Sequence, residues 1–421
     1  MAKPFTWSSS IPNALPILED HSQTKLRILQ EYIELYIKIV FGSSFRSHGG
    51  KITLIDGFAG GGIYQGNQEG SPLVMIEAVR AAETILNANR RIPIKIDAQY
   101  WFVEKDPDAF ACLDGVLRAK GHGPEIGHSI FTRKGCFEDH LSDILSAIKK
   151  RHPREGGRAI FFLDQCGYSK VTIPTLANIS RMLNGKAEFI INFAVDWLER
   201  YAHDGDNFRQ AYSNLGLTDV NVDDLLSLKD SGVCDWQYLV EAKLAPAIVK
   251  ESGAKYYSPF YIRPASQRNG YWLLHLAPHA RARAAMTDVH WANSNGSIHY
   301  GNLGLNMLAY KPDFDPSAYL SGLSFTEATK EATRQTLSKE LAKQAHEQHQ
   351  NGITLKQLFE FNCNGTIANR ELFDQAVLRA SVSGDVKILG PSGGKKQSPN
   401  LQLNDVIYPE RQILINLSPS I

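Results

Sequence analysis

The chain has 421 residues, 43% of them hydrophobic, which is enough for one large folded domain with one or two smaller ones. Its 45 Lys and Arg residues nearly balance 44 Asp and Glu residues, so no overall charge indicates binding to nucleic acid. The N-terminus lacks a basic region followed by an apolar run, and no stretch of about 18 apolar residues occurs. We therefore expect a globular, cytoplasmic protein that is not anchored in a membrane.

Residues 22–41 carry apolar side chains at helical spacing, with Ser22 as the expected N-cap. Apolar runs then predict strands, and helical patterns separate most of them. The expected strands are 51–56, 98–104, 128–135, 159–164 and 187–193, and the expected helices are 71–88, 107–119, 137–150 and 172–184. This alternation predicts an α/β domain with a Rossmann-like, doubly wound and mostly parallel sheet.

The same reading divides the chain into four parts. We expect an N-terminal helical segment at 1–45 and a Rossmann domain at 46–320, followed by a linker helix at 321–351 and a winged-helix-like domain at 352–421. The Rossmann domain includes a helical insertion at about 200–250 and an antiparallel strand pair, 256–263 and 271–278, at the sheet edge. The last part reads as two short helices followed by a hairpin, the pattern of a small winged helix.

Neither the cysteines nor the histidines have the spacing of a metal site. No CxxC pair occurs, so we read the cysteines as reduced thiols rather than as disulfides or metal ligands. Four histidines, at positions 275, 279, 290 and 299, raise the alternative of a metal site. Pro278 interrupts helical pairing of the first two, so we expect none. The five cysteines are Cys112, Cys136, Cys166, Cys234 and Cys363.

A glycine-rich turn follows the first expected strand in LIDGFAGGGIYQGNQEGSPL (54–73). Asp56 ends the strand, and Phe58, Gly60 and Gly62 follow at the spacing D-x-F-x-G-x-G. Bare backbone admits a ligand closely, and open parallel sheets bind ligands at the carboxyl ends of their strands. The P-loop lysine is missing and the spacing differs from G-x-G-x-x-G, so the turn suits a ligand with an amino-acid end, whose ammonium Asp56 would attract.

D-x-F-x-G-x-G after a first strand resembles motif I of class I S-adenosylmethionine-dependent methyltransferases. The resemblance implies S-adenosylmethionine as cofactor, with Asp56, Phe58, Gly60 and Gly62 forming its binding turn. It implies Glu104 on the ribose hydroxyls and Glu138 or Asp139 on the adenine amino group. The alternatives are an ordinary strand-end acid for Glu104 and a helix N-cap for Glu138 or Asp139.

The whole chain resembles the three-Cys-motif partner family (TcmP) more closely. The resemblance is clearest from His21 to about Arg200, in HSQTKLRIL, IDGFAGGGIYQGNQEGSPL, FVEKD, FFLDQCGYS and INF. It continues more loosely through YWLLHLAPH and the C-terminal helices. It implies a methyltransferase-like domain and a partner protein that carries three cysteines of radical-SAM type.

The stretch FFLDQCGYS (161–169) lies at the fourth expected strand end, where amino-methyltransferases acting on bases have D/N-P-P-Y/F. Asp164 and Tyr168 keep the acid and the aromatic and are the expected catalytic residues. The missing prolines weaken the amine-methylation reading. Cys166 raises a second alternative, a nucleophilic cysteine, but a small half-buried cysteine is the preferred interpretation.

Candidate substrate-binding residues lie in two places. His21 and Lys25 are four residues apart, so they share a helix face and could meet an anionic substrate near the cofactor, or form a solvated helix start. Lys395 and Lys396 lie in the turn PSGGKKQS and would contact phosphates if the C-terminal domain binds DNA; a solvated turn is the alternative. Asn192, at the fifth strand end, lines the pocket in one reading and packs the strand in the other.

Three functions are compatible with these motifs to different degrees. The leading one is an S-adenosylmethionine-binding, methyltransferase-like enzyme acting on nucleic acid or on a product of its three-Cys partner. The rival is a non-catalytic Rossmann scaffold that presents the winged helix to DNA, RNA or a partner protein. An NAD-dependent enzyme is disfavoured because the acid precedes the glycines.

Overall fold

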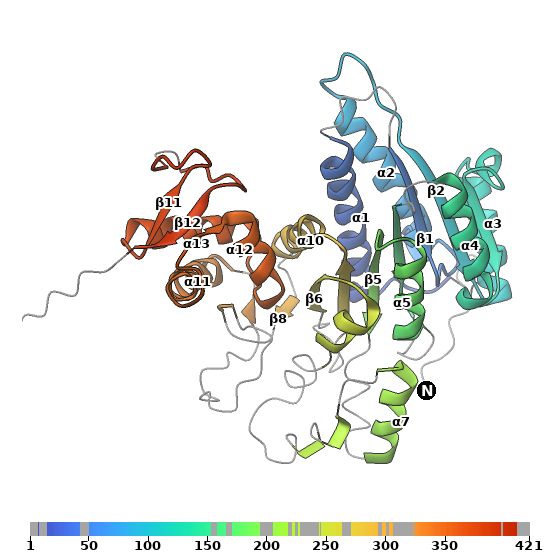
Figure 1. The fold of residues 1–421 in the computed structure, drawn as a ribbon. Coiled ribbons are helices and arrows are strands. Elements are labelled where there is room, and N and C mark those ends of the chain that lie inside the picture. The colour runs from blue at the N-terminus through green and yellow to red at the C-terminus, as the bar shows by residue number, and fades with distance from the viewer. Residues whose placement is uncertain are drawn as a thin grey trace, which may run out of the picture. The chain divides into compact units, whose positions relative to one another are not determined.

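The computed structural model describes most of the chain as two compact units, 1–298 and 299–421, which are taken separately below (Figure 1). The described residues are 7, 15–42, 50–152, 158–165, 171–193, 205–217, 221–223, 226–227, 244, 246–262, 271–293, 297–299, 303–305, 323–324, 326–396 and 399–410.

The first unit is built on a mixed sheet in the order β3-β2-β1-β4-β5-β7-β6-β8. Strands β1 to β5 run parallel, whereas β7 is antiparallel to both β5 and β6. The expected mostly parallel α/β sheet is therefore confirmed. The strands are β1 Lys51–Asp56, β2 Asp97–Glu104, β3 Ile130–Lys134, β4 Ala159–Leu163, β5 Ala187–Phe193, β6 Tyr256–Ile262, β7 Tyr271–Ala277 and β8 Ser297–His299.

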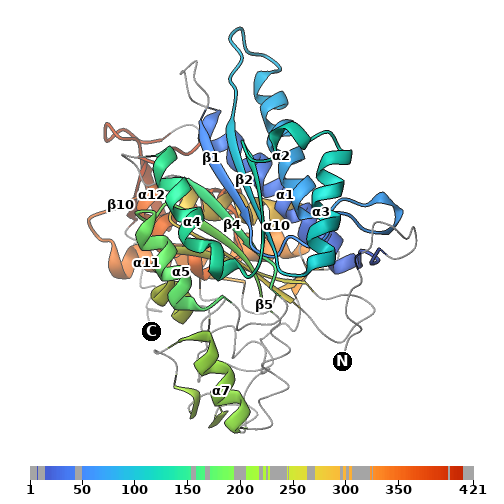
Figure 2. The same cartoon turned by 90° about the vertical axis from the view of Figure 1, so that its right-hand side faces the viewer.

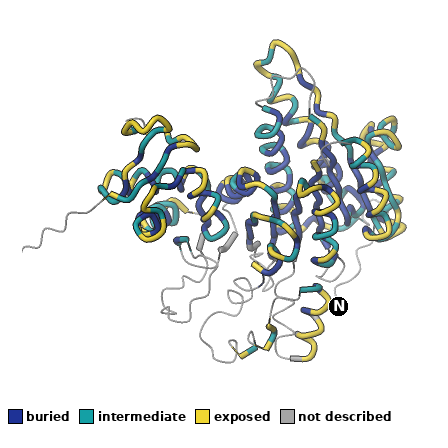
Figure 3. Tube along the Cα trace, in the orientation of Figure 1, coloured by how far each residue is buried: buried dark blue, intermediate teal, exposed yellow. Residues whose placement is uncertain are grey.

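Helices cover both faces of this sheet. Figures 1 and 2 show α1, α2 and α10 on one face and α4 and α5 on the other. The central strands β1 and β4 and the inner side of α1 are mostly buried, whereas the covering helices carry exposed residues on their outer sides (Figure 3). The helices are α1 Asp20–Phe41, α2 Ser71–Asn87, α3 Pro107–Ala119, α4 Phe137–Arg151, α5 Ile173–Met182, α7 Gly205–Leu215 and α10 Ala280–Ala292, with short 3-10 turns η1 Gln65–Asn67 and η2 Gly123–Glu125.

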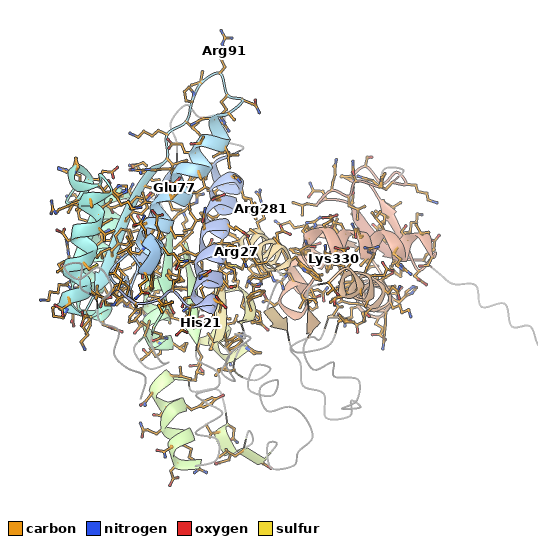
Figure 4. All side chains as sticks on the ribbon, turned by 180° about the vertical axis from the view of Figure 1, so that it is seen from behind. His21, Arg27, Glu77, Arg91, Arg281 and Lys330 are labelled. Carbon is orange, nitrogen blue, oxygen red and sulfur yellow. The ribbon has the colours of Figure 1, made fainter. Side chains whose placement is uncertain are left out.

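Helix α1 begins earlier than its sequence suggested. The expected N-cap Ser22 is wrong, because the helix starts at Asp20 with Glu19 in an extended conformation before it. The backbone N–H of Ser22 donates to the carbonyl of Glu19 at 2.8 Å, so Ser22 already lies inside the first turn. Because α1 starts at Asp20, His21 lies within the helix. Figure 4 shows His21 near the lower end of α1.

The antiparallel pair β6 and β7 forms as expected, but its place in the sheet differs. Strand β7, the later of the two in sequence, pairs with β5 on one side and β6 on the other. Strand β6 also pairs with β8, so neither strand is a free edge. Of the expected helical insertion at 200–250, the described residues show α7 and short helical pieces, and the rest lies outside them.

The second unit combines helices with a small antiparallel sheet in the order β10-β12-β11. The expected two helices and hairpin strands are present as α12, α13, β11 and β12. The assignment of this unit as a winged helix stays a prediction. Helix α11 packs on α13, with Leu337, Leu341 and Ala345 among its buried residues. Arg379 of α13 pairs with Glu331 of α11 at 3.0 Å. The elements are β9 Leu323–Ser324, α11 Glu327–Gln348, β10 Ile353–Thr354, α12 Leu355–Asn362, η4 Cys363–Gly365, α13 Arg370–Val382, β11 Val386–Leu389 and β12 Val406–Pro409.

Candidate functional site

The strand order reverses between β1 and β4. From β1 the chain proceeds outward to β2 and β3, then returns to β4 on the other side of β1 and continues to β5. Such a switch point leaves a crevice outside the carboxyl ends of the two central strands, because the connections leave in opposite directions. Asp56 ends β1, Glu104 ends β2, Asp164 follows β4 and Asn192 lies at the end of β5. The expected cofactor and catalytic acids therefore meet at one edge of the sheet.

The glycine turn after β1 has a backbone that favours glycine. Gly60 and Gly62 have φ angles of +60° and +74°, in the left-handed region that other residues rarely adopt. A Cβ on Gly70 would lie 3.1 Å from the backbone of Gly62, and the N–H of Gly70 donates to the carbonyl of Gly62 at 2.9 Å. Gly62 and Gly70 therefore bring the two ends of this loop into backbone contact before α2 begins.

Asp56 is fully buried at the base of this turn. Its Oδ1 accepts the backbone N–H of Phe58 at 3.0 Å, whereas Oδ2 is buried without a hydrogen-bond partner among the described residues. Burial raises the pKa of Asp56 to about 7, and the nearby carboxylates of Asp164 and Glu104 add to the rise, while Ser71 and Phe58 oppose it. A cationic group at Oδ2 would offset the cost of burying the carboxylate charge and would donate the missing hydrogen bond.

Glu104 is half-buried at the end of β2 and holds the glycine turn in place. Its Oε2 accepts the backbone N–H of Gly60 at 2.7 Å, and its Oε1 accepts the backbone N–H of Asp106 at 2.7 Å. Each carboxylate oxygen has a further acceptor site. The same side chain could therefore fix the turn and accept hydroxyl protons from a ligand.

Asp164 is held by side chains from α1 and β5. The Nζ of Lys25 donates to Oδ1 and Oδ2 of Asp164 at 2.8 and 2.6 Å, and the Nδ2 of Asn192 donates to Oδ1 at 2.7 Å. Because a carboxylate only accepts, the amide nitrogen of Asn192 must face it, and Oδ1 of Asn192 is left buried without a partner among the described residues. Lys25, expected at a substrate, instead fixes the expected catalytic acid.

His21 lies one turn before Lys25 on the same face of α1 and is also buried. Its Nδ1 lies 3.2 Å from a carboxylate oxygen of Glu19. Burial lowers the pKa of His21, and the charge of Lys25 lowers it further, while Glu19 and Asp164 oppose the shift. Burial therefore favours the neutral imidazole. The structure thus brings His21 and Lys25 together beside the fourth-strand acid.

Gln165 follows Asp164 and is 2% exposed. Its Oε1 accepts the backbone N–H of Val171 at 3.0 Å, so these two described residues are in direct contact. Its Nε2 is a buried donor without a partner among the described residues. The expected catalytic residue Tyr168 and the alternative nucleophile Cys166 lie outside the described residues. Gln165 was not anticipated from the sequence, where it only marked a departure from the D/N-P-P-Y/F pattern.

The two acids after β3 differ in their surroundings. The backbone N–H of Cys136 donates to Oδ2 of Asp139 at 3.3 Å, as part of a capping box at the start of α4. Glu138 is exposed beside it. Asp139 therefore has the capping function that was the alternative to adenine binding, and Glu138 is the acid left to meet a ligand.

The two lysines of the second unit differ in their surroundings. Lys396 pairs with the buried carboxylate of Asp405 at 2.8 Å and is 15% exposed, whereas Lys395 is exposed. Lys396 therefore already has an anionic partner within its own unit. Only Lys395 presents its charge to solvent in the way expected of a phosphate contact.

The histidines that suggested a metal alternative have other settings. His275 lies 3.4 Å from the buried carboxylate of Glu188, and Nδ1 of His290 lies 3.1 Å from the hydroxyl of Ser258. No group of three or more potential ligands gathers within the part of the chain that the structure describes. Cys112, Cys136 and Cys363 are free thiols, and the other two cysteines lie outside the described ranges. In the same part of the chain no helix is long and apolar enough to cross a membrane.

Comparison with known proteins gives weak structural likenesses. No protein-family model and no curated protein sequence matches this chain, so membership of the TcmP family stays a prediction. Among solved structures, a Legionella pneumophila protein of the DUF519 family is similar at 10% identity, covering 66% of this chain and 95% of its own, with a TM-score of 0.34. The O-methyltransferase TomG of Streptomyces achromogenes, solved with S-adenosylmethionine, is similar at 12% identity over 60% of this chain and 80% of its own, with a TM-score of 0.28.

Proposed function

We propose that the first unit binds S-adenosylmethionine at the carboxyl ends of β1 and β2 and is methyltransferase-like. The observation that carries this proposal is the unpartnered, buried Oδ2 of Asp56 beside a glycine turn at the switch point of the sheet. A buried carboxylate oxygen without a donor is costly, and an ammonium group offers both charge and hydrogen bonds to it. The acid-then-glycine order and the mostly parallel sheet with antiparallel β7 fit a class I methyltransferase-like fold.

The surrounding residues suit the remaining parts of that ligand. Glu104 would accept the ribose hydroxyls while it holds the N–H of Gly60, and the exposed Glu138 would meet the adenine amino group. When bound, S-adenosylmethionine supplies an electrophilic methyl group. The described residues contribute binding and orientation around it, with Phe58 and Gly62 shaping the turn.

For the substrate side, we place Asp164 as the residue that orients or deprotonates a substrate group. Oδ1 of Asp164 already accepts two donors, whereas Oδ2 accepts one described donor and lies on a side chain that is 29% exposed. Oδ2 is therefore the atom that would accept a substrate proton or hydrogen bond. Tyr168 would complete the site, and nucleic acid or a product of a three-Cys, radical-SAM-type partner is the substrate that we infer.

A non-catalytic scaffold is the second candidate, and one observation favours it. Lys25 and Asn192 together fix Asp164, so both of its carboxylate oxygens already accept hydrogen bonds within the unit. In that case the first unit would keep the ligand, and the second unit would present a winged helix to DNA, RNA or a partner protein.

Titration calorimetry tests the proposed ligand. We expect one molecule of S-adenosylmethionine, or of S-adenosylhomocysteine, to bind per chain, and Asp56→Asn to weaken both ligands because the ammonium loses its carboxylate. Absence of heat with either ligand, at concentrations that saturate ordinary methyltransferases, would contradict the proposal. Binding without transfer to any nucleic acid tested would favour the scaffold.

A further inference from the structure

Trp7 lies directly on the glycine turn of the candidate cofactor site. A Cβ added to Gly61 would lie 2.2 Å from Cε3 of Trp7 and 2.8 Å from its Cδ2, and one added to Gly60 would lie 3.2 Å from its Cζ2. The three nearest atoms to each added Cβ all belong to this indole. At these two positions, the group that needs bare backbone is therefore a tryptophan of the same chain.

The indole also forms a corner with a second aromatic ring. The ring centroids of Trp7 and Tyr64 lie 5.3 Å apart at an interplanar angle of 63°. Trp7 is only half-buried, so it keeps surface that a ligand could contact. Two rings set at a steep angle, near a buried carboxylate, resemble the surroundings in which proteins bind alkylated cations.

A sulfonium group is a cation with three carbon substituents and no N–H or O–H, so it cannot donate conventional hydrogen bonds. Carboxylates and the faces of aromatic rings can both stabilise its charge. The carboxylate of Asp56 is already assigned to the ammonium end of the ligand. An indole over Gly60 and Gly61 is placed to meet the neighbouring cationic centre.

We propose that Trp7 forms the aromatic wall of the cofactor site and contacts the sulfonium of bound S-adenosylmethionine. The inference rests on the proposed function and extends it to a residue about 50 positions before the glycine turn. It makes Trp7 a residue that distinguishes the methyl donor from its neutral, demethylated product.

The test is calorimetry with S-adenosylmethionine and S-adenosylhomocysteine, because only the first carries the sulfonium charge. Trp7→Ala should weaken S-adenosylmethionine about tenfold, the range of a desolvated cation–π contact, and S-adenosylhomocysteine much less. Trp7→Phe should lose less than Trp7→Ala, because Phe keeps an aromatic face. Melting of each ligand-free variant checks that the fold is intact.

Gly61→Ala provides a matched variant that leaves Trp7 in the chain. The added methyl would collide with the indole, and Gly61 is not among the glycines with positive φ, so alanine strains the backbone little. It should therefore reproduce the selective loss for S-adenosylmethionine.

Equal losses for the two ligands, no loss, or tighter binding in Trp7→Ala would overturn this inference, because the indole would then only support or block the turn. Wild-type protein that binds neither ligand would instead overturn the proposed function, and with it this role for Trp7. The two failures are thus distinguished by the wild-type titration alone.

Discussion

The ammonium of Lys25 donates to both carboxylate oxygens of Asp164, at 2.8 and 2.6 Å, across 139 residues of sequence. The two side chains differ in burial: Lys25 is 6% exposed and Asp164 is 29% exposed. Removing the carboxylate would therefore leave a nearly buried cation, whereas removing the ammonium would leave an anion that water and Asn192 can still reach. The pair thus predicts unequal costs for substitution of its two members.

We expect Asp164→Asn to lower the free energy of unfolding by about 3 kcal/mol, the scale for breaking a buried ion pair on one side. Lys25→Met, which keeps the length of the side chain, should cost about 1–2 kcal/mol. Denaturant unfolding of the single variants measures both values.

The double variant Lys25→Met/Asp164→Asn separates stability from chemistry. It removes both charges of the pair, so it should lose less stability than the sum of the single variants. If a methyl-transfer reaction is found, turnover should still fall about 10²-fold or more, because Asp164 is absent. Full activity in a stable double variant would remove Asp164 from the reaction.

Binding should depend on pH through Asp56. The ligand ammonium needs an ionised carboxylate, and the ligand-free pKa of Asp56 is about 7. Affinity for S-adenosylhomocysteine should therefore rise up to about tenfold per pH unit from pH 5 towards 7 and level off above it. Calorimetry across this pH range measures how affinity changes with pH. The Asp56→Asn side chain cannot ionise, so this variant should show no pH dependence that arises from residue 56.

The same shift predicts a change in stability. The folded pKa of Asp56 lies above its unfolded value, so ligand-free protein should lose stability as pH rises from about 4 to 7. At pH 8, Asp56→Asn should be more stable than wild type by up to about 4 kcal/mol, and the difference should vanish near pH 4. A variant less stable than wild type at pH 8 would mean that the carboxylate has a partner that stabilises it.

Glu104 should contribute to ligand affinity in two ways, by holding the glycine turn and by contacting the ligand. Glu104→Ala should weaken S-adenosylhomocysteine by roughly 1–3 kcal/mol, because the ribose hydroxyls and the N–H of Gly60 both lose their charged acceptor. Glu104→Gln keeps one oxygen and should lose less. If the alanine variant binds like wild type in calorimetry, Glu104 is only a strand-end acid.

Substitution of the two lysines of the second unit should have different effects: one on stability, the other on DNA binding. Lys396→Ala leaves the buried Asp405 unpaired and should destabilise this unit by about 3 kcal/mol, whereas Lys395→Ala should leave its melting unchanged. If the unit binds DNA, Lys395→Ala should reduce the salt slope of binding by about 0.9, one phosphate contact. Unchanged affinity and slope in Lys395→Ala would exclude that contact.

Sequence patterns were sufficient for the local elements. The expected helix 107–119 and strands 51–56 and 187–193 have the observed bounds, because apolar periodicity and flanking residues such as Asp106 act within one element. Sheet order is set by contacts between distant segments, so the insertion of β7 between β5 and β6 could not be predicted from local pattern.

The sequence indicated separate candidate residues for the site but not the contacts between them. Asp56, Glu104, Asp164 and Lys25 were each candidates, yet nothing local indicates that Lys25 neutralises Asp164 across 139 residues. Trp7 was missed for the same reason, since its contact with the glycine turn arises from tertiary packing. The glycines themselves were the available signal, because a run of three requires something close to the backbone.

We propose that a ligand of the S-adenosylmethionine type binds between the glycine turn after β1 and the acid that ends β2. Hydrogen–deuterium exchange of wild-type protein, with and without saturating S-adenosylhomocysteine, tests both the binding and its place. We expect slower exchange in peptides that cover Asp56–Gly62 and Glu104–Asp106, with the second unit, 299–421, unchanged. Unchanged exchange throughout, or protection confined to segments away from these two strand ends, would contradict it.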